Sequence, residues 1–183
     1  MGIYVAPPGG PALFQGEVLR NLVVLVPDRH SLQPGAVTFR PEVHPLAVLV
    51  HPDCDLDRDH KGRTSTTEPV NSALLSQVLL CPAYNQDEIR AENSYFGTRD
   101  FKQIRQNQNE RFHCLPAGQI GDGPASLEEM FVDFRHAMGV PTELLYEAVA
   151  AQTTERLALV NDVFKHDLIQ RFCSYLGRVA LPD

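Results

Sequence analysis

The chain has 183 residues, a length that suits one domain with a full core and is short for two large ones. Its hydrophobic share of 43% and charged share of 21% are ordinary for a globular protein, and its net charge of −7 argues against broad electrostatic capture of nucleic acid or an anionic membrane. No apolar run approaches the roughly 20 residues that span a bilayer, and no signal peptide is evident. We therefore expect a cytoplasmic protein without a membrane partner.

Apolar runs bounded by proline and glycine predict a series of short strands. Residues 1–14 are rich in both breakers and are expected to form a flexible N-terminal arm. Strands are then expected over residues 15–26, 37–39, 46–50, 74–80, 111–115 and 128–134. Residues 58–71 have almost nothing to bury and are expected to form a surface loop.

Two helices are predicted near the C-terminus. Residues 142–150 read as a short helix, and residues 162–177 keep apolar side chains on one face before Gly177 ends the pattern. Several short strands followed by an amphipathic helix indicate one domain over 15–183. The predicted fold class is mainly β with a C-terminal α-helix (α+β), in the form of a small SH3-like β-barrel closed by that helix.

Four short motifs follow this order of elements. They are Gln15-Gly16-Glu17-Val18, Pro45-Leu46-Ala47-Val48-Leu49-Val50, Val78-Leu79-Leu80-Cys81-Pro82 and Glu155-Arg156-Leu157. Together they resemble the opening strand, the second strand, a later strand and the entry to the final helix of the PemK/MazF-like toxins. The resemblance implies an SH3-like barrel of prokaryotic toxin or defence-type ancestry, with a protein or RNA partner and a possible homodimer.

The residues that carry RNA cleavage in that family are replaced in this chain. The family has an Arg before the Pro of its second strand, where this chain has His44. It has a Thr or Ser after the later Pro, where this chain has Ala83 and Tyr84. An imidazole at the first position would neutralise the developing charge of a phosphate only when protonated. We therefore expect no RNA cleavage in the manner of the toxin family.

The stretch richest in reactive side chains follows the predicted strand 46–50 and reads His51-Pro52-Asp53-Cys54-Asp55-Leu56-Asp57-Arg58-Asp59-His60. A strand end is a rigid platform on which sites are often built. Cys54 could act as a nucleophile with a histidine such as His51 as its base, although neighbouring carboxylates raise a thiol pKa. The structural interpretation, which we favour, makes Cys54 a packed residue and Asp55 an acceptor for backbone N–H groups of the turn.

Metal binding is a further interpretation of the same stretch. Cys54, His60, Cys81 and His113 are the candidate zinc ligands, although their spacing matches no standard zinc motif. The alternating aspartates lack the Gly and the Glu that a calcium loop requires. No other cofactor is evident, so we expect none, with zinc as the open alternative.

Candidate binding residues lie outside that stretch. Arg63 belongs to a polar segment that could grip a phosphate, and Lys102, Arg105 and Arg111 form a basic, amide-rich segment that could follow an RNA backbone. The alternative for the Arg63 segment is a solvated loop, and the second segment lacks the interleaved aromatic residues that stack on bases.

The sequence leaves two functions open. The first is a binding or effector subunit of a toxin-like or defence-type system, with a protein or RNA partner. The alternative is a hydrolase, either a diverged endoribonuclease or a thiol- or metal-dependent enzyme centred on Cys54 and Asp55. The candidate catalytic residues for the alternative also include His51 and His44.

Overall fold

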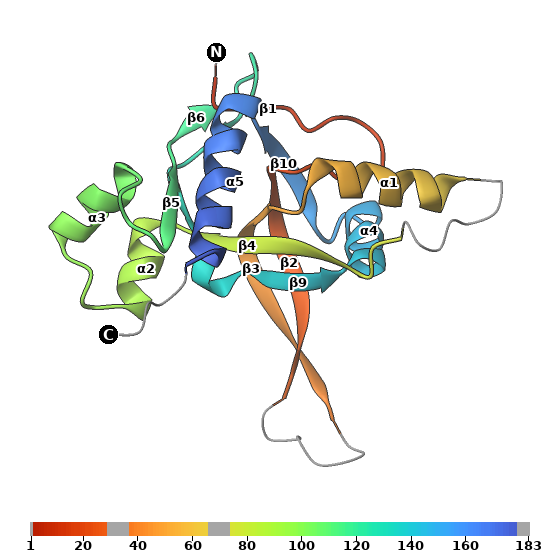
Figure 1. The fold of residues 1–183 in the computed structure, drawn as a ribbon, viewed down its shortest axis with the longest axis horizontal. Helices are drawn as coiled ribbons and strands as arrows, with labels where there is room; N and C mark the ends of the chain where they lie inside the picture. Colours follow the sequence, from red (N-terminus) through yellow and green to blue (C-terminus); the bar gives the residue numbers. More distant parts are fainter. Residues whose placement is uncertain (1, 29–36, 66–73, 179–183) are drawn as a thin grey trace.

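A curled antiparallel sheet forms the centre of the molecule, in a computed structural model that describes residues 2–28, 37–65 and 74–178. Its strand order is β1–β10–β2–β3–β4–β8–β5, and β9 pairs with a second stretch of β4. Helix α5 lies across one face of the sheet (Figure 1). The α+β class with a C-terminal helix is therefore confirmed, with the sheet curled into a half-barrel.

The elements follow one another along the chain with short connections. The strands are β1 (Tyr4–Val5), β2 (Glu17–Pro27), β3 (Phe39–Leu49), β4 (Gln77–Tyr84), β5 (Phe112–Leu115), β6 (Gly118–Gln119), β7 (Ser126–Leu127), β8 (Met130–Asp133), β9 (Met138–Pro141) and β10 (Glu155–Val160). The helices are α1 (Asp53–Thr64), α2 (Gln86–Glu92), α3 (Thr98–Arg105), α4 (Thr142–Ala150) and α5 (Asp162–Leu176), with a 3₁₀ turn η3 (Phe134–His136).

The two faces of the sheet are covered by different helices. On one face, Leu168 and Phe172 of α5 pack against a cluster that includes Val18 and Val48. On the other face, α1 and α4 contribute Leu56 and Leu145 to a second apolar cluster. A third cluster, rich in phenylalanine, joins α2 and α3 to β5 and β8. Burial of apolar surface on both faces holds the central strands in place.

The N-terminal segment, expected to be a flexible arm over residues 1–14, contacts the body through residues 3–4 and Leu13, which are buried, while most of the residues between them are exposed. Tyr4 of β1 is fully buried, pairs with Val160 of β10 and donates its hydroxyl to the carbonyl of Pro116 at 3.0 Å. Leu13 is buried as well. Proline and glycine set the path of this segment, but its few apolar side chains fix it to the core.

Strand β3 runs unbroken from Phe39 to Leu49, where the sequence predicted two separate strands. Pro41 and Pro45 lie within it, and a proline cannot donate a backbone hydrogen bond. They are accommodated because β4 pairs with β3 only over Leu46–Leu49, so both prolines lie on a stretch whose outer edge has no strand beside it.

The distal parts of β2 and β3 leave the sheet as a two-stranded projection, here called the arm and comprising residues 22–27 and 39–44 (Figure 1). Strand β10 pairs with β2 only as far as Arg20. At the next residue, Asn21, the backbone adopts φ 57°, the left-handed conformation that asparagine tolerates better than most residues. This bend marks the point at which the arm leaves the body.

None of the helices within the described ranges is long and apolar enough to cross a membrane.

Candidate functional site

Residues 53–64 form helix α1, where the sequence predicted a surface loop beginning at residue 58. The helix is tied to the body by Asp59, whose carboxylate is fully buried. Asp59 accepts hydrogen bonds from the backbone N–H of Leu75 and from Nε of Arg63, both at 2.8 Å. The remainder of the expected loop, residues 66–71, lies outside the described residues.

The structure brings together three of the four candidate catalytic residues at the junction of β3 and α1. Sγ of Cys54 lies 3.7 Å from Oδ1 of Asp55, and Oδ2 of Asp55 lies 4.0 Å from Nε2 of His51. The imidazole of His51 is mostly buried, and neither of its nitrogens has a hydrogen-bond partner among the described residues. Burial lowers its pKa, against an opposing effect of Asp55. Cys54 is exposed.

This arrangement is unfavourable for a thiol nucleophile. The thiol of Cys54 contacts the carboxylate of Asp55, and no hydrogen bond joins it to an imidazole among the described residues. Asp55 therefore separates Cys54 from the imidazole that would have to act as its base.

The backbone-holding role predicted for Asp55 belongs to Asp53, so that prediction was wrong in the residue it named. Oδ1 of Asp53 accepts the backbone N–H of Gln15 at 2.7 Å, and Oδ2 pairs with Nζ of Lys165 at 3.0 Å. The cause is the start of α1 immediately after Pro52. The first helical residue faces the β2 entry and α5, while Asp55 lies half a turn further on and is partly exposed.

The four candidate zinc ligands lie on three separate elements. Cys54 and His60 belong to α1, Cys81 lies in the core on β4, and His113 is buried on β5 behind α5. Burial raises the pKa of the Cys81 thiol. Within the described part of the chain, no group of three or more His, Cys, Asp or Glu side chains is arranged to hold a metal ion.

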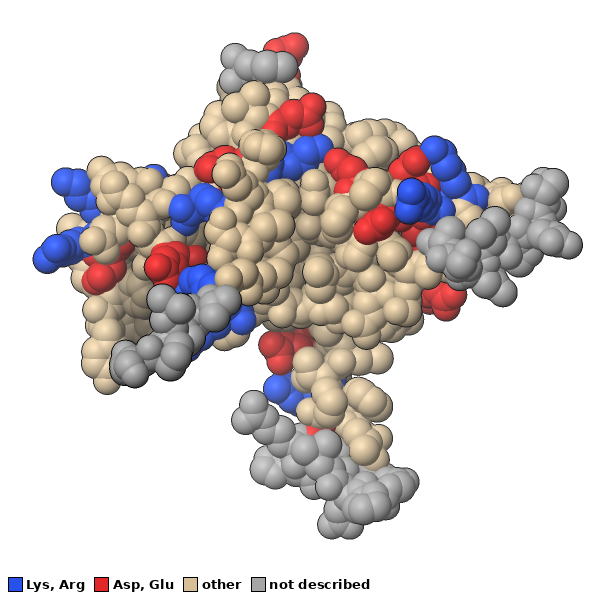
Figure 2. Space-filling model, in the orientation of Figure 1, with Lys and Arg blue, Asp and Glu red and all other residues tan. Residues whose placement is uncertain are grey.

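Most of the candidate binding residues are engaged within the protein. Three of them form ion pairs: Arg63 with Asp59, Arg105 with Glu129, and Arg111 with Asp133. Lys102 on α3 is exposed. Acidic and basic side chains are interspersed on the face seen in Figure 2, rather than gathered into one basic tract.

A buried carboxylate that the sequence analysis missed links several polar groups at the end of β8. Asp133 is fully buried and accepts hydrogen bonds from Nε of Arg111 at 2.9 Å and from the backbone N–H of Arg135 at 3.0 Å. Its Oδ2 also lies 3.0 Å from Nδ1 of His136. The acidic residue that ends an otherwise apolar run was the available signal in the sequence.

The fourth candidate catalytic residue, His44, lies on β3 away from the β3–α1 junction. The side chain of His44 is mostly buried, and its Nε2 lies 3.7 Å from Oε1 of Glu42. The pKa of His44 is lowered, mainly by burial and also by the charge of His136, against an opposing effect of Glu42. The structure therefore separates His44 from Cys54 and Asp55.

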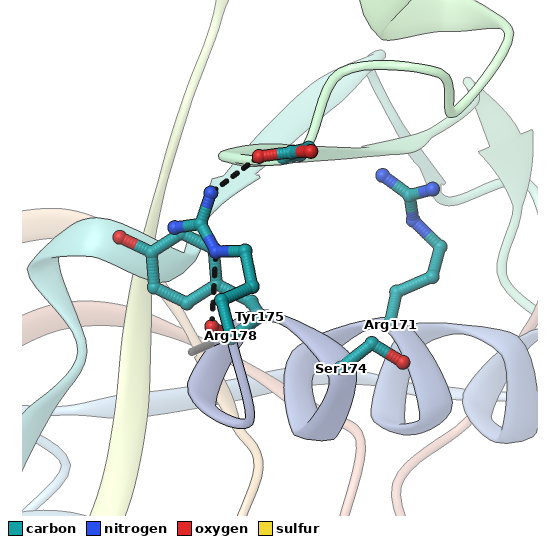
Figure 3. Close-up of a pocket in the computed structure, with 5 residues that line it drawn as sticks. Arg171, Ser174, Tyr175 and Arg178 are labelled. Atoms are coloured by element: carbon teal, nitrogen blue, oxygen red, sulfur yellow. Dashed lines mark hydrogen bonds and ion pairs between the residues drawn. The ribbon is translucent and has the colours of Figure 1, made fainter. Parts of the chain in front are cut away.

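A hollow of about 260 Å³ lies between the end of α5 and the loop before β5 (Figure 3). Arg178 pairs with Glu110 and stacks on the ring of Tyr175. Arg171 donates to backbone carbonyls of the loop, at 2.6 Å to Asn109 and 3.1 Å to Phe112. Both cations already hold the loop, and the C-terminal end of a helix disfavours an anion. We therefore interpret this hollow as part of the contact that holds the loop before β5 to helix α5.

The arm carries an exposed apolar surface, here called the arm face, made of Val23, Leu25, Phe39 and Val43. Their exposed fractions are 43%, 55%, 59% and 57% respectively. Val23 pairs directly across the strands with Val43, and Leu25 with Pro41. The side chains that alternate with them on β2, Leu22 and Val24, are buried instead.

A groove of about 230 Å³ runs beside the arm, between β2 and helix α4. It is lined almost entirely by apolar side chains, contributed by residues 22–25 and Phe39 of the arm, by Val140 and Pro141 of β9, and by Leu144, Leu145 and Ala148 of α4. This surface could not be predicted from the sequence, because residues 22–26 form one continuous apolar run that does not reveal which side chains are buried.

Comparison with known proteins identifies no relative: no family model matches the chain, and no curated protein or solved structure has a significant match to it.

Proposed function

We propose that this protein is a binding or effector subunit that docks another protein through its arm. The main observation in support of this proposal is the arm face, on which four large apolar side chains lie next to one another and are each about half exposed. A contiguous exposed apolar patch of this kind is typical of a protein–protein contact. The arm also projects away from the body, which leaves it accessible to a partner (Figure 1).

A protein partner is favoured over RNA by the charges of the molecule. The net charge is −7, and three of the four candidate basic residues are already held in ion pairs. RNA binding relies on free cations along the phosphate backbone and on exposed aromatic rings for stacking. The arm face offers apolar contact instead.

The toxin-like or defence-type ancestry is part of the proposal. Two of the motifs that resemble the toxin family meet in the fold, since Glu17 of β2 is buried against Arg156 of β10, with Nε of Arg156 3.1 Å from both carboxylate oxygens. The curled sheet with its C-terminal helix is compatible with an SH3-like barrel. These features support the ancestry without carrying an activity.

The alternative, a hydrolase centred on Cys54 and Asp55, has one observation in its favour. Asp55 lies 3.7 Å from the thiol of Cys54 and 4.0 Å from the imidazole of His51, just after the end of strand β3. The order of the groups opposes it, because the carboxylate stands where a base would have to contact the thiol. We therefore propose binding as the main function.

The test compares partner recovery by the tagged full-length protein expressed in its native host. Leu25→Glu combined with Val43→Glu places two carboxylates on the arm face, and we expect affinity for a stoichiometric protein partner to fall about tenfold or more. The matched control is Val163→Glu, at an apolar residue of α5 that is 71% exposed and far from the arm in the fold. Equal recovery by the arm variant and the wild type would contradict the proposal, as would a partner that is lost on ribonuclease treatment.

A further inference from the structure

The outer edge of β2 in the arm presents backbone groups that have no partner among the described residues. Asp28 donates its N–H to the carbonyl of Thr38 at 2.8 Å, so these two residues form a hydrogen-bonded pair. In an antiparallel ladder such pairs alternate with pairs that do not exchange hydrogen bonds. The Leu25–Pro41 and Val23–Val43 pairs are therefore of the second kind, which agrees with the missing N–H of proline.

The N–H and C=O groups of Val23 and Leu25 consequently point away from β3, toward the groove. The backbone carbonyl of Asn21, two residues before Val23, also points away from β3. It accepts a hydrogen bond from the hydroxyl of Thr154, just before β10 begins. Beyond this point β10 no longer covers β2, and the described strands leave the edge at Val23 and Leu25 open.

The opposite edge of the arm is less suited to strand pairing. On β3 the outward backbone positions include Pro41 in the arm and Pro45 next to it, which have no N–H to donate. Prolines of this kind are a common device against unwanted edge pairing. Within the arm, the edge of β2 is therefore the better template for an added strand.

We infer that the groove between β2 and α4 takes an extended segment of the partner protein, which adds to the sheet as a strand beside β2. This deepens the proposed function and rests on it. Strand addition supplies main-chain hydrogen bonds along the edge, while alternate side chains of the added strand enter the apolar groove. The occupant is thus an extended peptide with alternating apolar side chains.

The groove lining itself is uncharged, so the charge preference of the peptide comes from helix α4 and from the chain as a whole. Helix α4 carries two acidic residues and no basic one: Glu143 pairs with Arg63 at 3.5 Å, and Glu147 is exposed. The whole chain is acidic as well. A segment with lysine or arginine on either side of its apolar residues is therefore favoured over an acidic one.

The test uses a fluorescein-labelled peptide in which valine and threonine alternate between two pairs of lysines, with binding to the full-length protein followed by fluorescence anisotropy. Leu25→Pro removes one outward N–H without removing a bond to β3, and we expect it to weaken peptide binding about tenfold or more. Val43→Pro is the matched control, since it places the same residue on the same face but on the other edge, and binding should change less than about threefold.

A second measurement keeps the protein unchanged. A peptide of the same sequence with alternate backbone nitrogens methylated cannot pair as a strand, and we expect it to bind about tenfold more weakly than the parent. The strand-addition inference would be overturned by equal binding of the two peptides, by equal effects of the two proline variants, or by no binding of the peptide at all. It would also be overturned by a concentration-dependent dimer that Leu25→Pro abolishes while peptide binding is absent.

These outcomes are distinct from those that test the proposed function. Loss of the native partner with the Leu25→Glu and Val43→Glu variant, together with no effect of Leu25→Pro on that partner, would retain the arm face as a docking surface and remove strand addition.

Discussion

Asp53 illustrates how one residue position decides a structural role. It is the first residue of α1, and its two carboxylate oxygens reach the backbone of Gln15 and the amine of Lys165. Asp55 has the same side chain, but its polar contacts among the described residues are with His51 and Cys54 alone. The sequence indicated that a carboxylate in this stretch would hold backbone groups, but not which one, because that depends on where the helix begins.

Removal of the Asp53 carboxylate should therefore destabilise the protein. We expect Asp53→Ala to lower the free energy of unfolding by about 1–2 kcal/mol, since the part-buried backbone N–H of Gln15 loses its acceptor and Lys165 loses one of its two ion-pair partners, keeping Asp162. Asp55→Ala, the matched control at a side chain of similar exposure, should cost less than about 0.5 kcal/mol, because the described residues place no backbone N–H on its carboxylate. Urea unfolding of both variants provides the measurement. A larger loss for Asp55→Ala than for Asp53→Ala would refute this assignment.

His113 makes stability depend on pH. It is buried against Phe134, with Asp167 4.0 Å from Nδ1 and partly exposed, and burial together with the charge of Arg171 lowers its pKa to about 3. As pH falls below the ordinary histidine value, the unfolded chain takes up a proton that the folded protein does not. Stability is therefore lost between about pH 6.5 and pH 3, at up to about 1.4 kcal/mol per pH unit.

This pH dependence can be isolated by substitution. We expect His113→Leu to lose less stability than the wild type between pH 7 and pH 5, measured by urea unfolding at each pH. His166→Gln, at an exposed histidine of α5, controls for the loss of an imidazole. Parallel pH curves for His113→Leu and the wild type would show that His113 does not contribute.

At the scale of whole elements, apolar runs predicted the structure well and charged segments did not. The strand at 74–80 and the helices at 142–150 and 162–177 correspond to β4, α4 and α5. Helix α1 was missed because it buries little apolar surface. It is instead stabilised by charge: ion pairs at i, i+4 spacing, Lys61 with Asp57 and Arg63 with Asp59, with acidic residues in its first turn and basic ones in its last.

Strand β1 has only two residues, yet it should matter for stability because Tyr4 is fully buried. We expect Tyr4→Ala to lower the free energy of unfolding by about 3–5 kcal/mol, the usual cost of removing a buried aromatic ring. Val5→Ala, at the adjacent and partly exposed position, should cost less than about 1 kcal/mol. Thermal and urea unfolding check both values, and near-equal effects would mean that the N-terminal segment is not part of the core.

At the scale of the whole molecule, the sequence located polar residues better than it located surfaces. It identified His51, Cys54 and Asp55, which the fold does bring together. The sequence could not identify the arm face, because a run of apolar residues is found both in buried strands and in exposed ones. The distinction depends on where β10 and β4 stop pairing, and those end points are set by contacts between residues far apart in the chain.

The arm also has a mechanical consequence for the sheet. Its two strands continue into the centre of the strand order, with β10 beside β2 and β4 beside β3. A pull on the arm therefore enters the body through interior strands, which are restrained by neighbours on both sides, and not through an edge strand that could peel away. Glu17 and Arg156 clamp β2 to β10 near its buried end and act as an anchor for that load. Force from a bound partner would thus be shared across the sheet before any single strand detaches.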